Sequence, residues 1–469
     1  MTPPTITEAF LRTVAASGSR TALRWQGDDG TWESLTFDEL AERVASVAAG
    51  LRQLGLREGE RVLLMMRTIP EFHVADLAVL FAGGTPVSID ETSSPERIAF
   101  LVGHTRAKIA IVEDRSGVAR FDESAGKVYE ALKLVVVRSA DATADREDLV
   151  PLEWLLVRPP LDLAVASRAI WPEDLATISY VSGATGYPAG VMVTHRNVAA
   201  QVAALRGGFA EDLVGKRTLA YLPMSHVGAR AASHYLLAFT GLEIASCPDQ
   251  RQLASYLFDV RPQILFGHAQ MWEALRADVL DAVAQDPTAA TAFDDATREA
   301  APIALARSWG ETTPEQDAAW AELDESGLAL VRKTAGLDQV EHAVTGTSPD
   351  DPSLIEWFHA LGVPLAEAYG MAECTGAMTL SLRGIKPGTA GQPLPGIEVR
   401  IAKDGEVACR GDVVSPGYLR DPYLTAEAFD DDGWFYTGDL GEIDVDGHLR
   451  IVDRKRKDRY AADVGSLFT

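Results

Sequence analysis

The feature that most limits the fold is the alternation of helix-like and strand-like patterns along residues 37–112. Apolar residues in Phe37–Leu54 recur at helical spacing, and Asp38 and Glu39 stand near the start of that stretch. Arg61–Met66 is a short apolar run that is typical of a buried strand. The same two patterns continue, and they predict helices over 70–81 and 96–102 and strands over 84–89 and 107–112. This alternation favours an α/β fold, in which helices cover a parallel sheet.

The later parts of the chain have different textures. From Thr218 the alternation returns, with a helix expected over 253–258 and a strand over 264–266. Asp281–Ser326 is rich in alanine and acidic residues, which fits either a solvated helical insertion or a mobile loop. From Gly384 short strands alternate with glycine, proline and aspartate turns. We therefore expect an α/β subdomain over 1–210, a second one over 211–383 with a helical insertion over 276–330, and a small β-subdomain over 384–453.

Composition excludes several classes of protein. The chain has 469 residues, of which 43 are basic and 68 acidic, for a net charge of −25. Such a protein is a poor partner for nucleic acid or for an anionic membrane surface, because both bind lysine and arginine. Three cysteines are too few for a disulfide scaffold or a four-cysteine zinc site, and they fit a reducing cytoplasm. With no recognisable signal peptide and no integral membrane segment, we expect a cytoplasmic enzyme that acts on a small molecule.

A glycine-rich stretch follows a strand pattern over 176–181. Residues 180–195 read YVSGATGYPAGVMVTH, with three glycines within eight residues and two hydroxyl residues between them: Gly183, Gly186, Gly190, Ser182 and Thr185. Glycines let backbone amides approach a ligand closely, and hydroxyls add donors, so the combination suits phosphate oxygens. It is neither a Walker loop nor the dinucleotide fingerprint. Taken alone, the stretch also fits an ordinary flexible turn between a strand and a helix.

The stretch resembles the phosphate loop of the AMP-forming adenylate enzymes, which include acyl-CoA synthetases, peptide-synthetase adenylation domains and luciferases. Three further motifs follow in that superfamily's order: LPMSHV at 222–227, EAYGMAE at 367–373 and GWFYTGDLGEIDVDGHLRIVDRKRKD at 433–458. The resemblance covers most of the chain from Ala22 onward, and it is greatest to long-chain fatty acyl-CoA synthetases. It implies an α/β fold, the superfamily's large N-terminal domain, with two mixed or parallel sheets covered by helices and a small β-subdomain.

The resemblance also implies a two-step chemistry. A carboxylate attacks the α-phosphate of ATP to give an acyl-adenylate and pyrophosphate, and the thiol of CoA then displaces AMP. Asp439 would accept hydrogen bonds from the ribose hydroxyls, and Arg454 would contact the ribose and phosphate region. Tyr369 would stack on adenine. Glu373 would hold Mg²⁺, which prefers oxygen ligands, and His226 would lie near the substrate carboxylate, so these two are the expected catalytic residues.

Further site residues are carried over by the same motifs. The expected nucleotide or acyl-adenylate contacts are Ser182, Gly183, Ala184, Thr185, Gly186, Ala189, Gly190, Gly346, Thr347, Ser348, Pro349, Gly370, Met371 and Ala372. The expected acyl pocket is Tyr235, Leu236, Phe266, Gly267, His268 and Trp272. Arg456 and Lys457 would lie in the hinge. The identity of the acid stays open between a fatty acid and a bulky apolar acid such as a terpenoid or polyketide acid, because Ala269 and Gln270 replace the usual Pro-Arg.

The departures from the superfamily's pattern gather at one place. The loop lysine is replaced by Ala189, two hydroxyl residues by Ala184 and Ala372, and the leading threonine by Val181. All four lost groups would surround the ATP phosphates. Removing one preorganised donor to developing charge typically costs about 10²–10³ in rate. We therefore expect adenylation to be weak or lost, whereas an acyl-AMP has no β- or γ-phosphate to bind.

Three functional hypotheses follow. The first is an acyl-CoA ligase homologue that forms the thioester from an acyl-adenylate supplied by a separate adenylating enzyme. The second is a competent two-step ATP-dependent synthetase, and the third is a non-catalytic acyl or nucleotide-binding homologue. The expected cofactors are ATP or acyl-AMP, CoA and Mg²⁺.

The last residues resemble the start of the superfamily's C-terminal domain. Residues 454–469 would be the hinge and the beginning of that domain, with a DRKRKD segment one residue longer than usual and Val464 in place of a glycine. The chain stops at Thr469 inside this motif. We therefore expect the C-terminal lid domain to be largely absent from this sequence, through truncation or omission.

Overall fold

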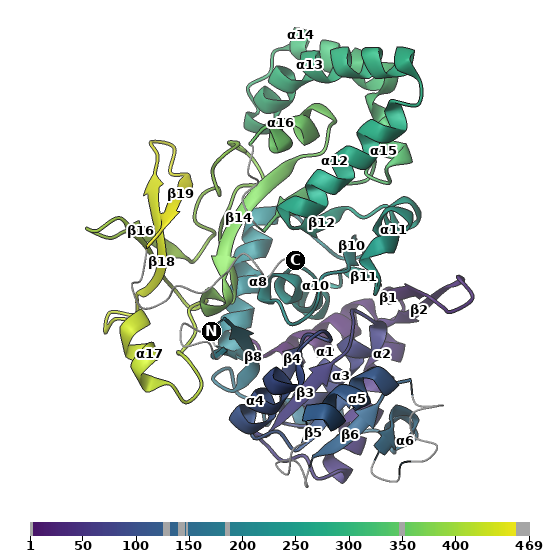
Figure 1. Cartoon of the computed structure of the whole chain (residues 1–469), viewed down its shortest axis with the longest axis vertical. Coiled ribbons are helices and arrows are strands. Elements are labelled where there is room, and N and C mark those ends of the chain that lie inside the picture. Colours follow the sequence, from purple (N-terminus) through teal and green to yellow (C-terminus); the bar gives the residue numbers. More distant parts are fainter. Residues whose placement is uncertain are drawn as a thin grey trace.

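An eight-stranded sheet crosses the middle of the molecule (Figure 1). The structure, a computed structural model, describes residues 3–124, 132–138, 146, 149–182, 188–346 and 352–455. The strands lie in the order β15 (Gly376–Leu380), β14 (Leu365–Met371), β13 (His342–Thr345), β12 (Ile264–Gly267), β10 (Arg217–Ala220), β11 (Glu243–Ser246), β1 (Thr21–Gln26) and β2 (Trp32–Thr36). The sheet is parallel from β14 to β1 and antiparallel at both edges.

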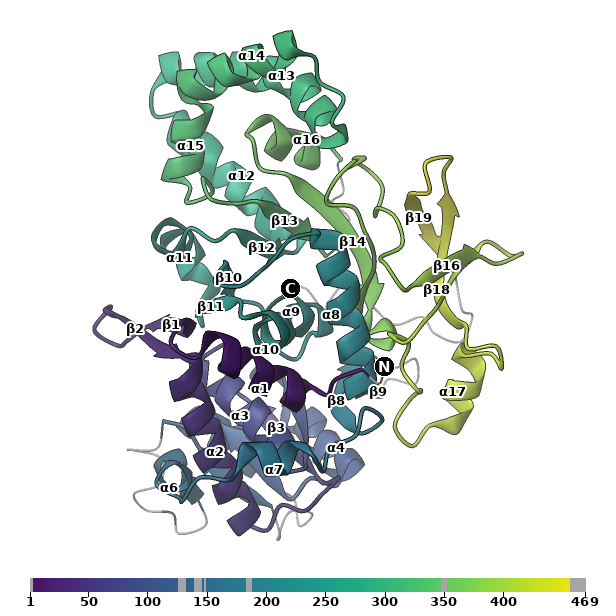
Figure 2. The same ribbon diagram turned by 180° about the vertical axis from the view of Figure 1, so that it is seen from behind.

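A second, all-parallel sheet lies in the N-terminal part of the chain. Its strands are β4 (Thr85–Ile89), β3 (Arg61–Met65), β5 (Ile109–Val112), β6 (Lys133–Val136) and β7 (Leu149–Pro151). Helices α2 (Phe37–Gln53), α3 (Pro70–Phe81), α4 (Pro95–Thr105) and α5 (Arg115–Ser124) accompany these strands (Figure 1), and Figure 2 shows α2, α3 and α4 from behind. The predicted alternation is confirmed. Helix α2 begins with a capping box in which Thr36 and Glu39 satisfy each other's backbone amides.

The glycine-rich stretch joins two strands of a hairpin, not a strand and a helix. β8 (Leu175–Val181) pairs antiparallel with β9 (Ala189–Thr194), and α8 (His195–Phe209) begins only after β9. Residues 183–187 of the loop lie outside the described residues. Thr194 and Asn197 form the capping box that starts α8. The described residues on both sides of the loop are therefore strands, and the first helical residue after it is His195.

The predicted insertion is helical, which decides against a mobile loop for its described residues. It contains α12 (Ala269–Val283), α13 (Pro287–Trp309), α14 (Pro314–Leu323), the π-helical turn η3 (Asp324–Leu328) and α15 (Ala329–Thr334), with α16 (Ser353–Ala360) beside it. These helices share a small core of their own that includes Phe293, Leu328 and Leu361. The Trp309 indole N–H donates to the carbonyl oxygen of Ile385 at 3.1 Å, which ties the insertion to the following segment.

The last described part is a four-stranded antiparallel sheet, coloured yellow in Figure 1. Its strands are β16 (Glu398–Ile401), β17 (Glu406–Arg410), β18 (Phe435–Ile443) and β19 (Leu449–Arg454), with α17 (Pro422–Ala428) nearby. Cys374 in the turn η4 (Ala372–Cys374) contacts Cys409 of β17, with 2.7 Å between the two Sγ atoms. Both are buried free thiols, so this contact helps to seat the small sheet against β14.

The remaining helices are short or cover the central sheet. They are α1 (Ile6–Ser17), α6 (Leu152–Leu156), α7 (Leu163–Ser167), α9 (Val227–Ala229), the π-helical η1 (Arg230–Tyr235), α10 (Leu236–Thr240), η2 (Gln250–Gln252) and α11 (Leu253–Val260). The largest buried apolar cluster runs from α1 through both α/β sheets to the small sheet. Within the described part of the chain, every helix is too short or too polar to cross a membrane.

Candidate active site

A cavity of about 1600 Å³ is lined by residues from all four sheets. It brings together fourteen of the residues that the motifs predicted: Ser182, Ala189, His226, Phe266, Gly267, His268, Gly346, Tyr369, Gly370, Met371, Ala372, Glu373, Asp439 and Arg454. Leu236 also lines it. Motifs that are more than 250 residues apart in sequence thus meet around one space.

Some predicted residues are not placed in this wall. Gly183, Ala184, Thr185, Gly186, Thr347, Ser348, Pro349, Arg456 and Lys457 lie outside the described residues. Gly190 is described, but it is buried in the β8–β9 hairpin against the Tyr180 ring.

Tyr369 and Asp439 form the polar centre of one end of the cavity. The Tyr369 hydroxyl donates to Asp439 Oδ2 at 2.6 Å, and Arg454 Nε lies 3.6 Å from Asp439 Oδ1. Asp439 on β18 and Arg454 on β19 are direct cross-strand partners, so the register of the small sheet places them together. Burial raises the pKa of the Asp439 carboxyl, although the hydrogen bond from Tyr369 and the charge of Arg454 oppose this.

Glu373 is a buried carboxylate in the same wall. The Tyr418 hydroxyl donates to Glu373 Oε1 at 2.7 Å, and burial raises the pKa of Glu373. A carboxylate that is short of solvent gains most from a nearby cation. One protein carboxylate is also a suitable donor set for Mg²⁺, which usually keeps several waters and binds substrate phosphates. Glu373 therefore fits the magnesium ligand that the motif implies.

His226 stands directly before α9, where it faces the cavity. Its backbone N–H donates to the Pro223 carbonyl oxygen at 3.1 Å, which fixes the turn. Burial lowers the pKa of the imidazole, and the nearby Asp90 carboxylate opposes that effect. A lowered pKa keeps His226 neutral at neutral pH, so the ring can accept or donate a hydrogen bond without carrying charge.

Behind His226 lies a buried ionic network that the sequence did not reveal. Arg230 donates to Asp76 Oδ2 at 2.6 Å, to Ser88 Oγ at 2.8 Å and to the Tyr235 hydroxyl at 2.9 Å. His234 Nε2 lies 2.9 Å from Asp76 Oδ1. Although burial by itself raises the pKa of Asp76, Arg230 and His234 hold it at about 2. The network ties η1 to α3 and, through Ser88, to β4 at the cavity wall.

Two residues that were predicted to line the acyl pocket, Tyr235 and Trp272, lie outside it. Tyr235 is fully buried with its hydroxyl bound to Arg230, and it is absent from the cavity wall. Trp272 is also fully buried outside that wall: its indole N–H donates to the Val344 carbonyl oxygen at 3.4 Å, and its ring packs on Phe358. Both residues therefore support the fold behind the cavity.

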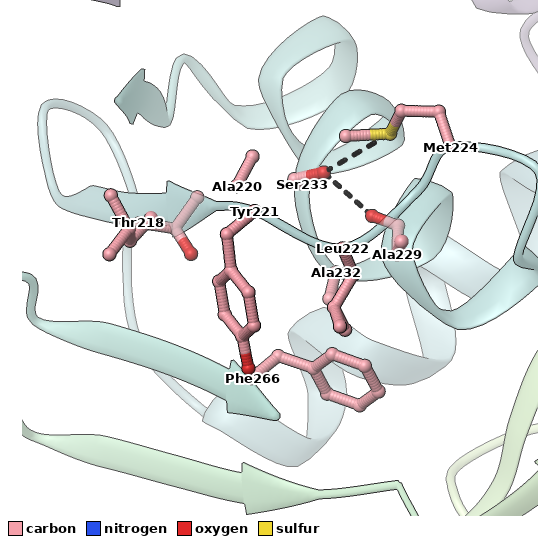
Figure 3. A pocket seen from close by; sticks show the side chains of 10 residues that line it. Thr218, Ala220, Tyr221, Leu222, Met224, Ala229, Ala232, Ser233 and Phe266 are labelled. Carbon is pink, nitrogen blue, oxygen red and sulfur yellow. Dashed lines mark hydrogen bonds between the residues drawn. The ribbon is translucent and has the colours of Figure 1, made fainter. Parts of the chain in front are cut away.

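The other end of the cavity is apolar. Its wall consists of Leu205, Phe209, Ala231, Ala232, Leu236, Ile264, Phe266, Val344, Ala368, Ala377 and Leu380. The Phe266 ring fits because Gly346 has no side chain: an added Cβ there would lie 2.7 Å from the tip of the ring. Behind the ring, between Tyr221 and Ala232, lies a small cavity of about 10 Å³, which is room for about one water (Figure 3).

Comparison with known proteins decides the family. Residues 10–419 match the family model described as AMP-binding enzyme. The chain belongs to this AMP-binding enzyme family. Among relatives, FadD15 of Mycobacterium bovis, described as a long-chain-fatty-acid–CoA ligase, is 32% identical over 448 residues, or 92% of this chain and 71% of that protein.

A second relative matches over a shorter length. The fadD11 protein of Mycobacterium tuberculosis, whose description is of a fatty-acid–CoA ligase, is 38% identical over 299 residues. The match covers 62% of this chain and 51% of fadD11, so this chain matches about half the length of that relative.

Solved structures confirm the fold of the family's N-terminal domain. The inhibitor-bound N-terminal domain of FACL13 from Mycobacterium tuberculosis has a TM-score of 0.72 at 22% identity, with 96% of this chain and 100% of that one covered. The anthranilate CoA ligase AuaEII, solved with anthranoyl-AMP, also has a TM-score of 0.72, at 18% identity, with 97% of this chain and 78% of that one covered.

Among the described residues that line the cavity, carboxylates outnumber cations. The described lining residues include the cations Arg97, Arg454 and Lys455 and the carboxylates Asp90, Glu91, Glu373 and Asp439. Lys455 is already paired, because its Nζ lies 2.6 Å from Asp404 Oδ2 and 2.8 Å from Glu406 Oε2. Ala189 and Ala372 present methyl groups. This wall offers little positive charge to a triphosphate.

Proposed function

We propose that this protein binds a hydrophobic acyl-adenylate and, as part of its full-length chain, transfers the acyl group to CoA, while its own adenylation by ATP is weak or lost. The observation that carries the proposal is the uneven wall of the cavity. Polar groups stand where the motifs imply ribose and adenine, an apolar lobe continues from them, and Ala189 and Ala372 face the position implied for the phosphates.

The nucleoside end supports binding of an adenylate. Asp439 has two carboxylate oxygens, and a ribose diol can donate to both if the Tyr369 hydroxyl gives up its bond or shares it. Hydrogen bonds to an ionised carboxylate are worth about 1.5–3 kcal/mol each. The charge of Arg454 beside Asp439 favours the ionised form of this carboxylate and so opposes the effect of burial on its pKa. A single α-phosphate also needs fewer cations than a triphosphate does.

The thioester step needs little from the missing groups. The CoA sulfur attacks the acyl carbonyl carbon, the thiol proton leaves to solvent or to a neutral base, and the bond from that carbon to the phosphate oxygen breaks to release AMP. A neutral imidazole at His226 can hydrogen-bond the reacting acyl group, because burial lowers its pKa. Glu373 would hold Mg²⁺ where adenylation occurs, and Mg²⁺ would there supply charge stabilisation for the pyrophosphate.

The partners follow from the same reasoning. The substrates are a hydrophobic carboxylic acid or its adenylate and CoA, and a separate adenylating enzyme would supply the acyl-AMP. We place the reaction in the cytoplasm. The main competing hypothesis is a two-step synthetase in which backbone amides of the loop supply the phosphate contacts.

Calorimetric binding to the full-length protein tests the proposal. We expect a non-hydrolysable acyl-adenylate analogue to bind at least about a hundredfold more tightly than ATP with Mg²⁺. ATP has no acyl group to contact the apolar lobe, and the protein has lost hydrogen-bond donors for the ATP phosphates. The Asp439→Ala variant should no longer bind the analogue, whereas Asp446→Ala, on the exposed β18–β19 turn, should bind it as tightly as the unmodified protein does. Tight ATP binding would favour the two-step synthetase. Binding of the analogue without thioester formation would favour a non-catalytic protein.

A further inference from the structure

We infer that Phe209, supported from behind by His342, is the floor of the acyl channel and restricts this protein to acyl groups of medium length. The inference rests on the proposed function, because it concerns the apolar lobe of the same cavity. It identifies the residues at the end of the lobe, the depth of the lobe and the class of acid that therefore fits.

Strand register shows how the lobe is built. In neighbouring strands, paired residues point to the same face of the sheet. Ile264 pairs with His342 and Phe266 with Val344. Because side chains alternate along a strand, positions 342, 344 and 346 share the cavity face of β13 and its end. Gly346 and Val344 line the cavity, and His342 is the next position inward on this face.

Helix α8 forms the opposite wall. Leu205 and Phe209 are four positions apart, so they lie on one face of the helix, and both are buried cavity-lining residues. Phe209 is the last residue of α8. Its ring meets the His342 ring edge to face, with 5.1 Å between centroids and 62° between planes. The two walls of the lobe therefore converge at this pair.

An ionic cluster holds the floor in place. His342 Nε2 is hydrogen-bonded to Glu211, and Lys216 Nζ lies 2.8 Å from Glu211 Oε2 and is also paired with Glu341. The Lys216 ammonium between the two carboxylates supplies the positive charge that this acidic group needs. The side chain of His342 is 15% exposed and that of Glu211 is 32% exposed, so the floor lies close to the outer surface at this point.

The depth of the lobe sets the length of the acyl group. Positions 342 to 346 span four strand residues, or about 13 Å at roughly 3.3 Å per residue. A fully extended chain of bonds advances at most about 3.6 Å for every three bonds, or about 1.2 Å per bond. An extended acyl chain that starts level with Gly346 therefore meets the floor after about eleven bonds. Decanoyl and dodecanoyl groups fit, whereas a hexadecanoyl group must displace Phe209.

The experiment measures how tightly the full-length protein binds non-hydrolysable acyl-adenylate analogues with hexanoyl, decanoyl, dodecanoyl and hexadecanoyl chains. We expect affinity to rise from hexanoyl to dodecanoyl as apolar surface is buried. It should then fall about tenfold for hexadecanoyl, which is a typical cost of overpacking. Phe209→Ala should restore hexadecanoyl binding to at least the wild-type dodecanoyl level.

Two more variants keep the inference open to disproof if Phe209→Ala fails to fold. Leu205→Trp narrows the lobe above the floor, so it should move the optimum to a shorter chain. Phe293→Ala removes a phenylalanine of similar burial from the separate core of the insertion, and it should leave the profile unchanged.

The possible results separate the inference from the proposed function. Equal affinity for dodecanoyl and hexadecanoyl analogues, or a chain-length profile that neither Phe209→Ala nor Leu205→Trp moves, would overturn the floor and leave acyl-adenylate binding intact. Failure of every analogue to bind would overturn the proposed function, and the inference with it.

Discussion

The two ends of the cavity differ in how many residues of the family motifs they retain. At the nucleoside end, Tyr369, Asp439 and Arg454 stand together within hydrogen-bond or ion-pair distance. At the phosphate end, Ala189 and Ala372 replace groups that the family motif would use for donors. Under the proposed function, a site changed at this end would still bind a nucleoside and an acyl group but would not need to stabilise pyrophosphate. The comparison then predicts that the two half-reactions depend on different residues of this chain.

The largest effect is expected from breaking the retained end. Asp439→Ala removes the carboxylate that would accept the ribose hydroxyls, and loss of such a preorganised group typically costs about 10²–10³ in rate. We expect thioester formation from acyl-AMP in the full-length protein to fall by about that factor. Ala372→Ser changes a residue of the phosphate end by one hydroxyl and should leave this rate within about threefold. If both variants slowed thioester formation equally, the nucleoside and phosphate ends would not differ in their importance for this step.

The next effect concerns the start of α8, the helix whose end reaches the acyl lobe. Burial lowers the pKa of His195 to about 4, and the Ile6 backbone N–H donates to its Nδ1 at 3.2 Å. A histidine with a depressed pKa stays neutral in the fold, whereas the unfolded chain takes up the proton below about pH 6.5. Stability should therefore fall as the pH falls from about 6.5 to 4, by about 3 kcal/mol from this residue alone.

Denaturant unfolding at several pH values checks the His195 prediction. His195→Asn keeps an acceptor for Ile6 but cannot be protonated, so its unfolding free energy should depend less steeply on pH between about 4 and 6.5. His104→Asn, at a half-buried position, serves for comparison: burial also lowers the pKa of His104, but less than that of His195, so the slope should change less. An unchanged slope in His195→Asn would show that the buried imidazole does not couple to folding.

A smaller effect is expected from repairing the altered end. Ala189→Lys returns a cation to the end of the glycine-rich loop, and a charge-assisted hydrogen bond is worth about 1.5–3 kcal/mol. ATP-dependent adenylation should rise by about ten- to a hundredfold, as measured by pyrophosphate–ATP exchange. Thioester formation from acyl-AMP should change little. No gain in exchange would mean that the alanine is not what limits adenylation.

The smallest effect sharpens the role of the buried network behind His226. Ser88→Ala removes one acceptor of Arg230 and leaves the Asp76 ion pair intact. We expect a loss of about 1 kcal/mol in unfolding free energy, the usual net worth of one hydrogen bond. Asp76→Asn leaves the buried Arg230 charge without its carboxylate counter-ion, and it should cost about 3–5 kcal/mol. If Ser88→Ala proved as damaging as Asp76→Asn, the ion pair would not be the main support.

Each helix or strand that local sequence patterns predicted with bounds has a counterpart in the structure. Helix α3 was predicted with its observed bounds, because Pro70 suits a first helical turn and an apolar run follows it. Strand β9 was missed because Ala189–Thr194 follows the glycines directly and is read as the end of a loop. The motifs found the polar end of the cavity, since each residue there stands inside a short recognisable string.

The errors and omissions share a physical cause, which is contact between distant parts of the chain. Tyr235 was assigned to the acyl pocket by the resemblance to the superfamily, yet Arg230 and Asp76 draw its hydroxyl into a network that spans α3 and η1. Phe209 was not singled out from the sequence, because its contact with His342 depends on the pairing of β12 with β13. No local pattern encodes that pairing.

The most direct test compares the two half-reactions in single-turnover assays of the full-length protein. One reaction receives dodecanoic acid, ATP, Mg²⁺ and CoA, and the other receives dodecanoyl-AMP and CoA. The account predicts thioester formation from dodecanoyl-AMP that is at least about a hundredfold faster than from the acid and ATP, because only the route from the acid and ATP needs the missing phosphate donors. Equal rates from the two starting points would contradict it.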